Sequence, residues 1–199
     1  MARQPLGTIA QAPIARAYDR ESALGNLFAD LMRAARPHAD VALINGGGLR
    51  QDLPAGPLTY EHLFEAMPFD NTFAQAHLTV GELALTLARN LERQRGFLSV
   101  SGVSVEARCE GRKVSVKLLQ QDGTPLPDER ELSVVTNDFL ATGGDGSFGG
   151  TPFVIEPSPT IRDEMARILR GRAEPLHPAD LYDPAHPRTR LPRTTGCLD

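Results

Sequence analysis

The sequence lacks tryptophan and has few aromatic residues, with eight Phe and three Tyr among 199 residues. Each Phe in a loop is therefore more informative than usual. No apolar run is long enough to span a bilayer, and the start, Met1–Pro5, lacks the apolar core of a signal peptide. The net charge of −4 gives no electrostatic basis for binding nucleic-acid polymers or anionic membranes.

Cysteine and histidine are also scarce. The two cysteines, Cys109 and Cys197, lie far apart in the sequence; they could pair, but nothing in the sequence requires it. The histidines are scattered, and no zinc-type spacing is present. His62 has no neighbouring nucleophile or base, which argues against a catalytic role. The five histidines are His38, His62, His77, His177 and His186.

The apolar pattern predicts three longer helices. Apolar residues at helical spacing place one helix at about 21–36 and another at about 160–170. Thr79 and Glu82 form a capping-box pattern that opens a third helix, which Gly96 is expected to stop. In that third helix, three arginines are expected to form a solvated face: Arg89, Arg93 and Arg95.

Strands are predicted at 72–78 and at several places between Phe97 and Asn137, where apolar and polar residues alternate. Together with the helices, this predicts an α+β fold: a mixed β-sheet flanked by helices. A length of 199 residues with 41% hydrophobic content is enough for one domain with a core. We expect a domain over residues 1–173. Prolines interrupt the rest, so 174–199 is predicted to be a tail that packs on this domain or trails from it.

A glycine loop follows the first predicted buried strand. Asn45 ends that apolar run, Gly46, Gly47 and Gly48 come next, and Arg50 follows one residue later. Without Cβ atoms, glycine N–H groups can approach an anion or a flat ring closely. Arg50 adds a planar charged group suited to phosphate or carboxylate. The alternative is a glycine-rich turn beside a solvated arginine.

Two further loops share this character. Proline restricts the segment 67–72, so Phe69 lies on a defined loop; a core phenylalanine is the alternative. After a second apolar run, the segment 136–146 contains Phe139 and a glycine pair that allows Asp145 to face inward. A surface aspartate in a turn is the alternative for Asp145.

Taken together, these segments resemble the C-terminal, nucleotide-binding domain of the 5′-nucleotidase and UDP-sugar hydrolase family. They occur in the order of the family and cover roughly residues 5 to 155. Any one of them is a weak motif, whereas six in order are a strong signal. The six segments are 21–27, 45–50, 56–60, 67–72, 97–102 and 136–146.

The resemblance implies a role for each loop. Two phenyl rings, Phe69 and Phe139, would sandwich a base, and Asp145 would accept hydrogen bonds from the ribose hydroxyls. Arg50 and the glycine N–H groups would bind phosphate, and Asn45 would contact the base edge or the ribose. The candidate substrate-binding residues are therefore Asn45, Gly46, Gly47, Gly48, Arg50, Phe69, Phe139 and Asp145.

Other features of the family are absent from this sequence. Its members hydrolyse phosphate esters with two divalent metal ions on a separate N-terminal domain, whose ligands occur in Asp-x-His and Asn-His pairs; neither pair occurs here. We therefore expect no catalytic residue, metal ligand or cofactor in this chain, and two metal ions on the missing domain. Ala23 stands where some members carry a phosphate-binding arginine, which weakens the case for full phosphate binding.

The most direct hypothesis is a substrate-binding domain that presents a nucleotide to a metallophosphoesterase domain of the same longer protein. That protein would be periplasmic or secreted, as the resemblance implies. One alternative is a stand-alone, non-catalytic nucleotide-binding module. Another is the same fold serving a hydrolase of cyclic nucleotides, UDP-sugars or sulfur substrates. Stacking accepts every base, so the sequence does not select one.

Overall fold

The structure is a computed structural model that describes residues 4–192 and 196–198. Residues 1–3 of the expected domain, and 193–195 and 199 of the expected tail, lie outside the described residues. Two short 3-10 helices, η1 and η2, flank the cavity described below. In chain order, the elements are β1 (Pro5–Ala10), α1 (Ala23–Ala35), β2 (Val41–Asn45), η1 (Gly46–Gly48), β3 (Gly56–Thr59), α2 (Tyr60–Ala66), β4 (Thr72–Thr79), α3 (Val80–Arg93), β5 (Leu98–Ser101), β6 (Ser104–Glu110), β7 (Lys113–Leu119), β8 (Glu131–Asn137), α4 (Asp138–Ala141), η2 (Gly144–Gly146), β9 (Val154–Thr160), α5 (Ile161–Arg170), α6 (Pro178–Leu181) and β10 (Thr189–Arg190).

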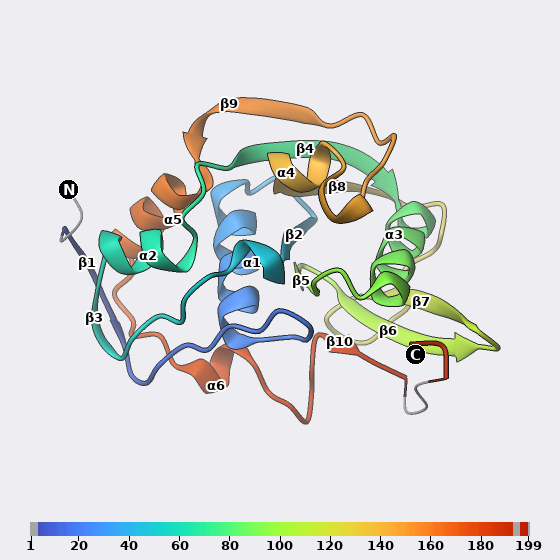
Figure 1. Ribbon diagram of the computed structural model, residues 1–199, viewed down its shortest axis with the longest axis horizontal. Coiled ribbons are helices and arrows are strands. Elements are labelled where there is room, and N and C mark those ends of the chain that lie inside the picture. Colours follow the sequence, from blue (N-terminus) through green and yellow to red (C-terminus); the bar gives the residue numbers. More distant parts are fainter. Residues whose placement is uncertain (1–3, 193–195, 199) are drawn as a thin grey trace.

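A five-stranded mixed sheet forms the centre of the molecule, with strand order β5-β2-β8-β4-β9. β2 and β8 run parallel, and the other neighbours are antiparallel. Helices α1 and α5 pack on one face, while α3 and the three-stranded sheet β10-β6-β7 pack against the other (Figure 1). The predicted α+β class, with a mixed sheet flanked by helices, is confirmed.

The apolar run of β2 reflects its place inside this sheet. All five of its residues are buried. Ala42 and Ile44 point into the core beneath α1, whereas Val41 and Leu43 point into the core beneath α3. Because both faces are covered, the strand has no polar side and reads as a continuous apolar run. The core on both sides holds the end of β2, and with it Asn45, in a fixed position.

Local signals predicted the helix starts correctly but misplaced one end. Thr79 and Glu82 form the predicted capping box of α3. The helix ends at Arg93, and Gln94, not Gly96, follows in the left-handed conformation with φ 50°. A similar capping box opens α2, where the His62 ring accepts a hydrogen bond from the Thr59 N–H; His62 therefore has a structural contact there.

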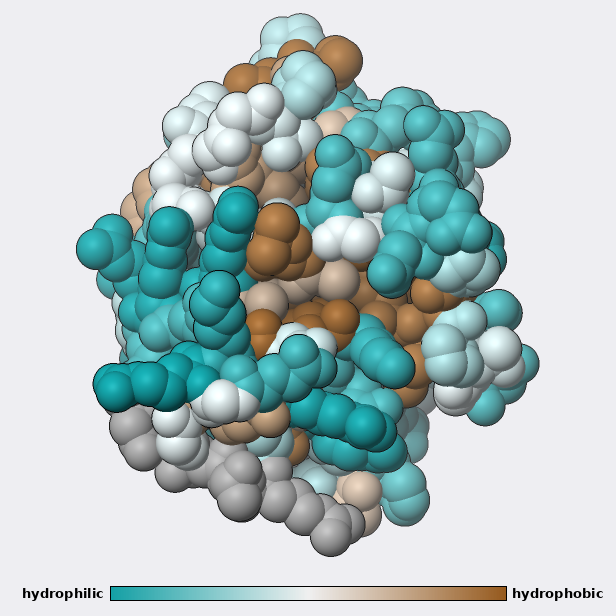
Figure 2. Space-filling view, turned by 90° about the vertical axis from the view of Figure 1, so that its right-hand side faces the viewer, coloured by the Kyte–Doolittle hydropathy of each residue, from teal (hydrophilic) through white to brown (hydrophobic). Residues whose placement is uncertain are grey.

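The three arginines predicted to be solvated lie on α3 or just after its end. Arg89, Arg93 and Arg95 are all exposed. Hydrophilic side chains dominate this end of the molecule and surround a smaller apolar area (Figure 2). Leu85 on α3 is one apolar side chain exposed to solvent. Among the described residues, no helix has the length and apolar character needed to cross a membrane.

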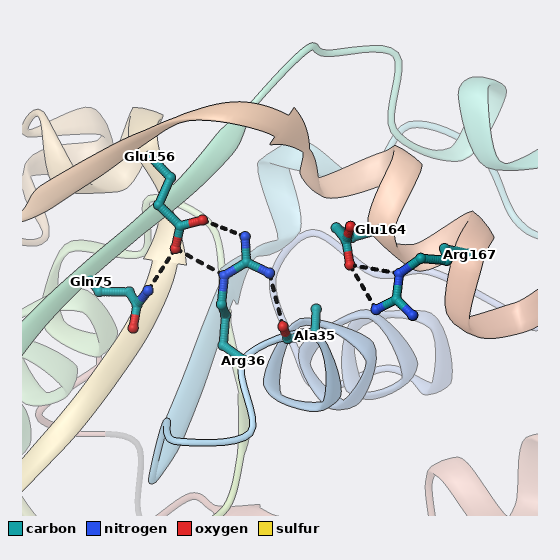
Figure 3. Close-up of polar contacts among 6 residues, drawn as sticks. All are labelled: Ala35, Arg36, Gln75, Glu156, Glu164 and Arg167. Carbon is teal, nitrogen blue, oxygen red and sulfur yellow. Dashed lines mark hydrogen bonds and ion pairs between the residues drawn. The ribbon is translucent and has the colours of Figure 1, made fainter.

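An ion pair attaches the edge strand β9 to the rest of the molecule. Arg36, just after α1, donates from Nε to Glu156 Oε1 at 2.8 Å and pairs with the other carboxylate oxygen through Nη2. Gln75 on β4 donates to Glu156 Oε1 at 2.5 Å (Figure 3). The hydrogen bond from Arg36 is the main cause that lowers the pKa of Glu156, against its partial burial. These contacts fix the strand that leads into α5.

The described residues of the expected tail contact several earlier elements. Leu176 donates its N–H to the Ile9 carbonyl of β1 at 2.8 Å. β10 pairs in parallel with β6, and the buried carboxylate of Glu21 accepts from the Thr189 N–H at 2.9 Å. Cys197 forms a disulfide with Cys109 on β6, a pairing that the sequence left open. A boundary at residue 173 stays a prediction.

Candidate functional site

The glycine loops meet at one end of the central sheet around a cavity of about 590 Å³. Asn45 is the last residue of β2, and Asn137 is the last residue of β8. Because these two strands are parallel neighbours, their carboxyl ends open at the same edge, where sheets of this kind bind ligands. The cavity is lined by Tyr18, Asn45, Gly47, Gly48, Arg50, Met67, Phe69, Asp70, Asn71, Asn137, Asp138, Phe139 and Asp145.

The structure brings the predicted aromatic and charged residues together. Arg50, Phe69, Phe139 and Asp145 come from three loops far apart in the sequence, yet all line this cavity. Phe69 is 38% exposed and Phe139 is 46% exposed. Phe69 is therefore not a core phenylalanine, which was the alternative that the sequence left open. Exposed rings in a concave site can stack on a flat ligand.

Arg50 lies beside one of these rings. Its guanidinium carbon is 5.2 Å from the centre of the Phe69 ring, within the range of a cation–π contact. The side chain is exposed, and within residues 4–192 and 196–198 it forms no ion pair. Among the described residues, no carboxylate of the cavity therefore lies within ion-pair distance of the Arg50 guanidinium.

Gly46 differs from its neighbours and does not line the cavity. Its N–H donates to the Phe97 carbonyl at 2.8 Å, so it is not free for an anion as predicted. A Cβ at Gly46 would lie 2.7 Å from the Tyr18 carbonyl oxygen. Glycine is needed here for the close approach of two backbone segments. Gly47 and Gly48 do line the cavity, as predicted.

A chain of amide contacts connects the ends of the two strands. Asn137 Nδ2 donates to Asn45 Oδ1 at 3.2 Å, and Asn45 Nδ2 donates to Asp145 Oδ2 at 2.9 Å. Asn137 Oδ1 also accepts from the Leu140 N–H and caps α4. Asp145 adopts a left-handed conformation with φ 54°, which aspartate tolerates better than most residues. The contact with Asn45 orients the Asp145 carboxylate at the cavity.

Gly144 provides room for the second ring. A Cβ at this position would lie 2.5 Å from Phe139 Cε1 and 2.5 Å from the Phe139 carbonyl oxygen. The ring of Phe139 therefore packs directly on the glycine backbone. Arg93, at the end of α3, donates from Nη1 to the Gly146 carbonyl at 2.9 Å and holds the other side of this turn.

Sequence reasoning did not include Asn71 among the substrate-binding residues, and it set aside Asp138, which forms a possible carboxylate pair with Asp145, as a structural turn residue. Both stand beside the predicted phenylalanines. Asn71 follows Phe69 by two residues, and Asp138 immediately precedes Phe139. Both side chains line the cavity, and Asn71 Nδ2 donates to Asp138 Oδ1 at 2.6 Å. Polar residues flanking both rings were the signal that could have identified them.

Tyr18 was also missed, because the segment before α1 carries no glycine motif. Its ring lies close to two glycines: a Cβ at Gly47 or at Gly96 would lie 3.5 or 3.4 Å from Tyr18 Cε2. Tyr18 also lines a second recess of about 390 Å³, which Arg16 and Arg20 help to line. These two arginines place guanidinium groups in that recess. Ala23, the position from which the sequence predicted weaker phosphate binding, is buried in α1.

Arg162, at the start of α5, is the buried support of the Phe69 loop. It is only 5% exposed. Its Nη1 donates to the carbonyls of Met67 and Phe69 at 3.0 and 2.8 Å, and its Nη2 pairs with Asp70 at 2.5 Å. Burial acts to lower the pKa of Arg162, but its hydrogen bonds, above all those with Tyr60 and Asp70, raise it overall. No sequence motif indicated this residue.

No metal centre accompanies these side chains. In the part of the chain that the structure describes, no group of three or more His, Cys, Asp or Glu residues is arranged to hold a metal ion. The cavity offers groups for stacking, hydrogen bonding and charge: two phenyl rings, three carboxylates, several amides and a guanidinium.

The similarity of this chain to known proteins indicates its family. The family model for the 5′-nucleotidase C-terminal domain matches residues 5–154. Endonuclease YhcR of Bacillus subtilis (strain 168) is 29% identical over 182 residues, which cover 83% of this chain and 15% of YhcR. Cell wall protein Lmo0130 of Listeria monocytogenes serovar 1/2a is 33% identical over 144 residues, covering 64% of this chain and 18% of Lmo0130.

Among solved structures, a 5′-nucleotidase precursor from Thermus thermophilus superposes with a TM-score of 0.75 at 27% identity; the match covers 96% of this chain and 40% of that protein. The chain thus spans less than half the length of each of these three proteins. The family match covers most of the chain and includes all three loops of the cavity. This chain belongs to the 5′-nucleotidase C-terminal domain family.

Proposed function

We propose that this chain is the substrate-binding domain of a 5′-nucleotidase-type phosphoester hydrolase. It would bind the nucleoside part of a nucleotide and present the phosphate to a two-metal site on a separate N-terminal domain. One observation carries the proposal: Arg50, Phe69 and Phe139, distant in the sequence, line the same cavity. Such a domain contributes to catalysis by orientation, which can lower the barrier by several kcal/mol.

Each group in the cavity matches one part of a nucleotide. A base between the rings of Phe69 and Phe139 would gain roughly 1–3 kcal/mol for each stacking contact. The Asp145 carboxylate, oriented by Asn45, would accept hydrogen bonds from two adjacent ribose hydroxyls. The guanidinium of Arg50 would bind phosphate.

Phosphate recognition would extend toward the neighbouring recess. Arg16 and Arg20 help to line that recess, which shares Tyr18 with the main cavity. Asp19 is 3.2 Å from Arg20 and neutralises part of its charge, so we assign the larger part of the attraction to Arg50. This side of the cavity is where the phosphate would face the separate metal-bearing domain.

Titration calorimetry of the 199-residue chain with adenosine and AMP tests the proposal. We expect saturable binding of both, with AMP tighter, and Arg50→Met should remove the advantage of AMP. Phe69→Ala and Phe139→Ala should each weaken binding about 5- to 150-fold, the equivalent of roughly 1–3 kcal/mol. Leu85→Ala, which shortens an exposed apolar side chain on α3, is the matched control. Absence of saturable binding up to millimolar adenosine and AMP would overturn the proposal.

We also propose that the protein is periplasmic or secreted. The Cys109–Cys197 disulfide supports this, since disulfides persist in oxidising compartments. The similarity to a protein described as a cell wall protein supports it further. Thiol labelling of the protein isolated from its native cells provides the test, because labelling of both cysteines without prior reduction would contradict an oxidising compartment.

A further inference from the structure

Two polar side chains lie beside the rings of the cavity and hold each other. Asn71 lies on the loop of Phe69, and Asp138 immediately precedes Phe139. Asn71 Nδ2 donates to Asp138 Oδ1 at 2.6 Å, and the same oxygen accepts from the Phe139 N–H at 2.9 Å. The main chain of Asn71 is also fixed, because its carbonyl accepts from the Ile161 N–H at 2.9 Å.

The chemistry of a carboxylate fixes the orientation of the Asn71 amide. An ionised carboxylate only accepts hydrogen bonds, whereas an amide has one accepting and one donating end. Asn71 can therefore face Asp138 only with its NH₂ group. Rotation of the amide by 180° would place its oxygen against the carboxylate oxygen. The Asn71 oxygen, and the second hydrogen of its NH₂ group, remain available to a ligand.

We propose that Asp138 fixes Asn71 as a reader of the base edge, so that the cavity selects bases with an exocyclic amino group beside a ring-nitrogen acceptor. Adenine and cytosine have this pattern. The inference rests on the proposed function, since it assumes that a base lies between Phe69 and Phe139. In other proteins an amide pairs with the N6/N7 edge of adenine in this bidentate way, accepting from the amino group and donating to a ring nitrogen. Here the Watson–Crick edge is the relevant one, because adenine (N1 and N6) and cytosine (N3 and N4) share the pattern there.

Keto bases present the reverse pattern. On the Watson–Crick edge, hypoxanthine and uracil offer a carbonyl oxygen where adenine and cytosine offer an amino group, and an N–H where those bases offer a ring-nitrogen acceptor. Against the fixed Asn71, two acceptors would meet and two donors would meet. The amide could adapt only by rotating and losing its bond with Asp138. Unpaired polar groups in a binding site are costly, so we expect adenosine to bind at least about tenfold more tightly than inosine.

Calorimetry of the chain with two matched nucleoside pairs, adenosine with inosine and cytidine with uridine, tests the selection. In the native chain, the amino member of each pair should bind at least about tenfold more tightly. In Asp138→Ala, this ratio should fall toward one, because no side chain at position 138 then fixes which end of the Asn71 amide faces a base. Asp70→Asn is the matched control: it removes a carboxylate that lines the same cavity but pairs with Arg162, and it should preserve the ratio.

The outcomes separate this inference from the proposed function. Equal affinities within both pairs for the native chain would overturn base selection while leaving nucleoside binding intact. Binding of none of the four nucleosides would overturn both. A second variant, Asn71→Ala, should weaken adenosine binding about tenfold and leave inosine binding nearly unchanged; an equal loss for both would contradict the role of Asn71 as reader. The native-chain ratios remain decisive if Asp138→Ala does not fold.

Discussion

Replacing Arg162 with methionine tests how the Phe69 loop is held in place. Methionine fills much of the same space but donates no hydrogen bond. The native guanidinium donates to the carbonyls of Met67 and Phe69 and to the Tyr60 hydroxyl, and it pairs with Asp70. Removing the guanidinium leaves the carbonyls of Met67 and Phe69 without their donor. The site is shielded from water, since Arg162 is only 5% exposed.

The expected size of the effect follows from these contacts. Hydrogen bonds to a charged group contribute roughly 1.5–3 kcal/mol each. The pair with Asp70 adds little, since that side chain is 79% exposed and surface ion pairs are worth about 0–1 kcal/mol. The remaining bonds share one guanidinium and are not additive. We expect a loss of about 3 kcal/mol in the free energy of unfolding, or about 6–12 °C in Tm for a chain of this size.

Chemical denaturation and adenosine titration of the same variant measure both consequences. The adenosine Kd should rise, but by no more than in Phe69→Ala, because the ring is displaced and not removed. Arg167→Met is the control on the same helix. The Arg167 side chain is 63% exposed, and its ion pair is with Glu164 on the same helix (Figure 3). The stability of this variant should therefore stay within about 0.5 kcal/mol of the native chain. Native-like stability and an unchanged Kd in Arg162→Met would refute this account of the loop.

Three further predictions concern the second ring, the tail and the edge strand. Gly144→Ala should displace the Phe139 ring and weaken adenosine binding severalfold, as measured by calorimetry. Gly149→Ala is the control and should leave adenosine binding unchanged, because an added Cβ at Gly149 meets nothing within 4 Å. Equal adenosine affinities of the two variants would contradict the packing of Phe139 on Gly144. Cys109→Ser breaks the disulfide and should lower the unfolding free energy by roughly 2–4 kcal/mol in denaturant titrations, and a change below about 0.5 kcal/mol would be inconsistent with that role. The Glu156 carboxyl has a pKa lowered from its ordinary 4.5. The ionised carboxylate therefore stabilises the folded chain fully above pH 4.5, and this contribution to the free energy of unfolding is lost as pH falls through the folded-state pKa. Glu156→Gln should therefore reduce the acid-induced drop in Tm below pH 4.5, and an unchanged dependence of Tm on pH would contradict this role of Glu156.

Several local features could be predicted from the sequence because they depend on residues a few positions apart. The capping box of Thr79 and Glu82 joins residues three apart, and the helix of 160–170 is recognisable from its apolar spacing. The apolar runs ahead of the glycine loops identified β2 and β8. Helix ends were less certain: Gly96 accommodates the Tyr18 ring, and the left-handed residue that follows α3 is Gln94.

The sequence by itself therefore determined the α+β class, the family resemblance and the loops that carry the two phenyl rings. Only the tertiary structure decided which polar groups meet there. Asn71 and Asp138 are 67 residues apart, and Arg162 is 93 residues from the Phe69 carbonyl that it binds. Contacts over such separations depend on the order of strands in the sheet and on the packing of α5, which no short sequence pattern encodes. For the same reason, the partners of Gly46 and of the two cysteines became apparent only in the folded chain.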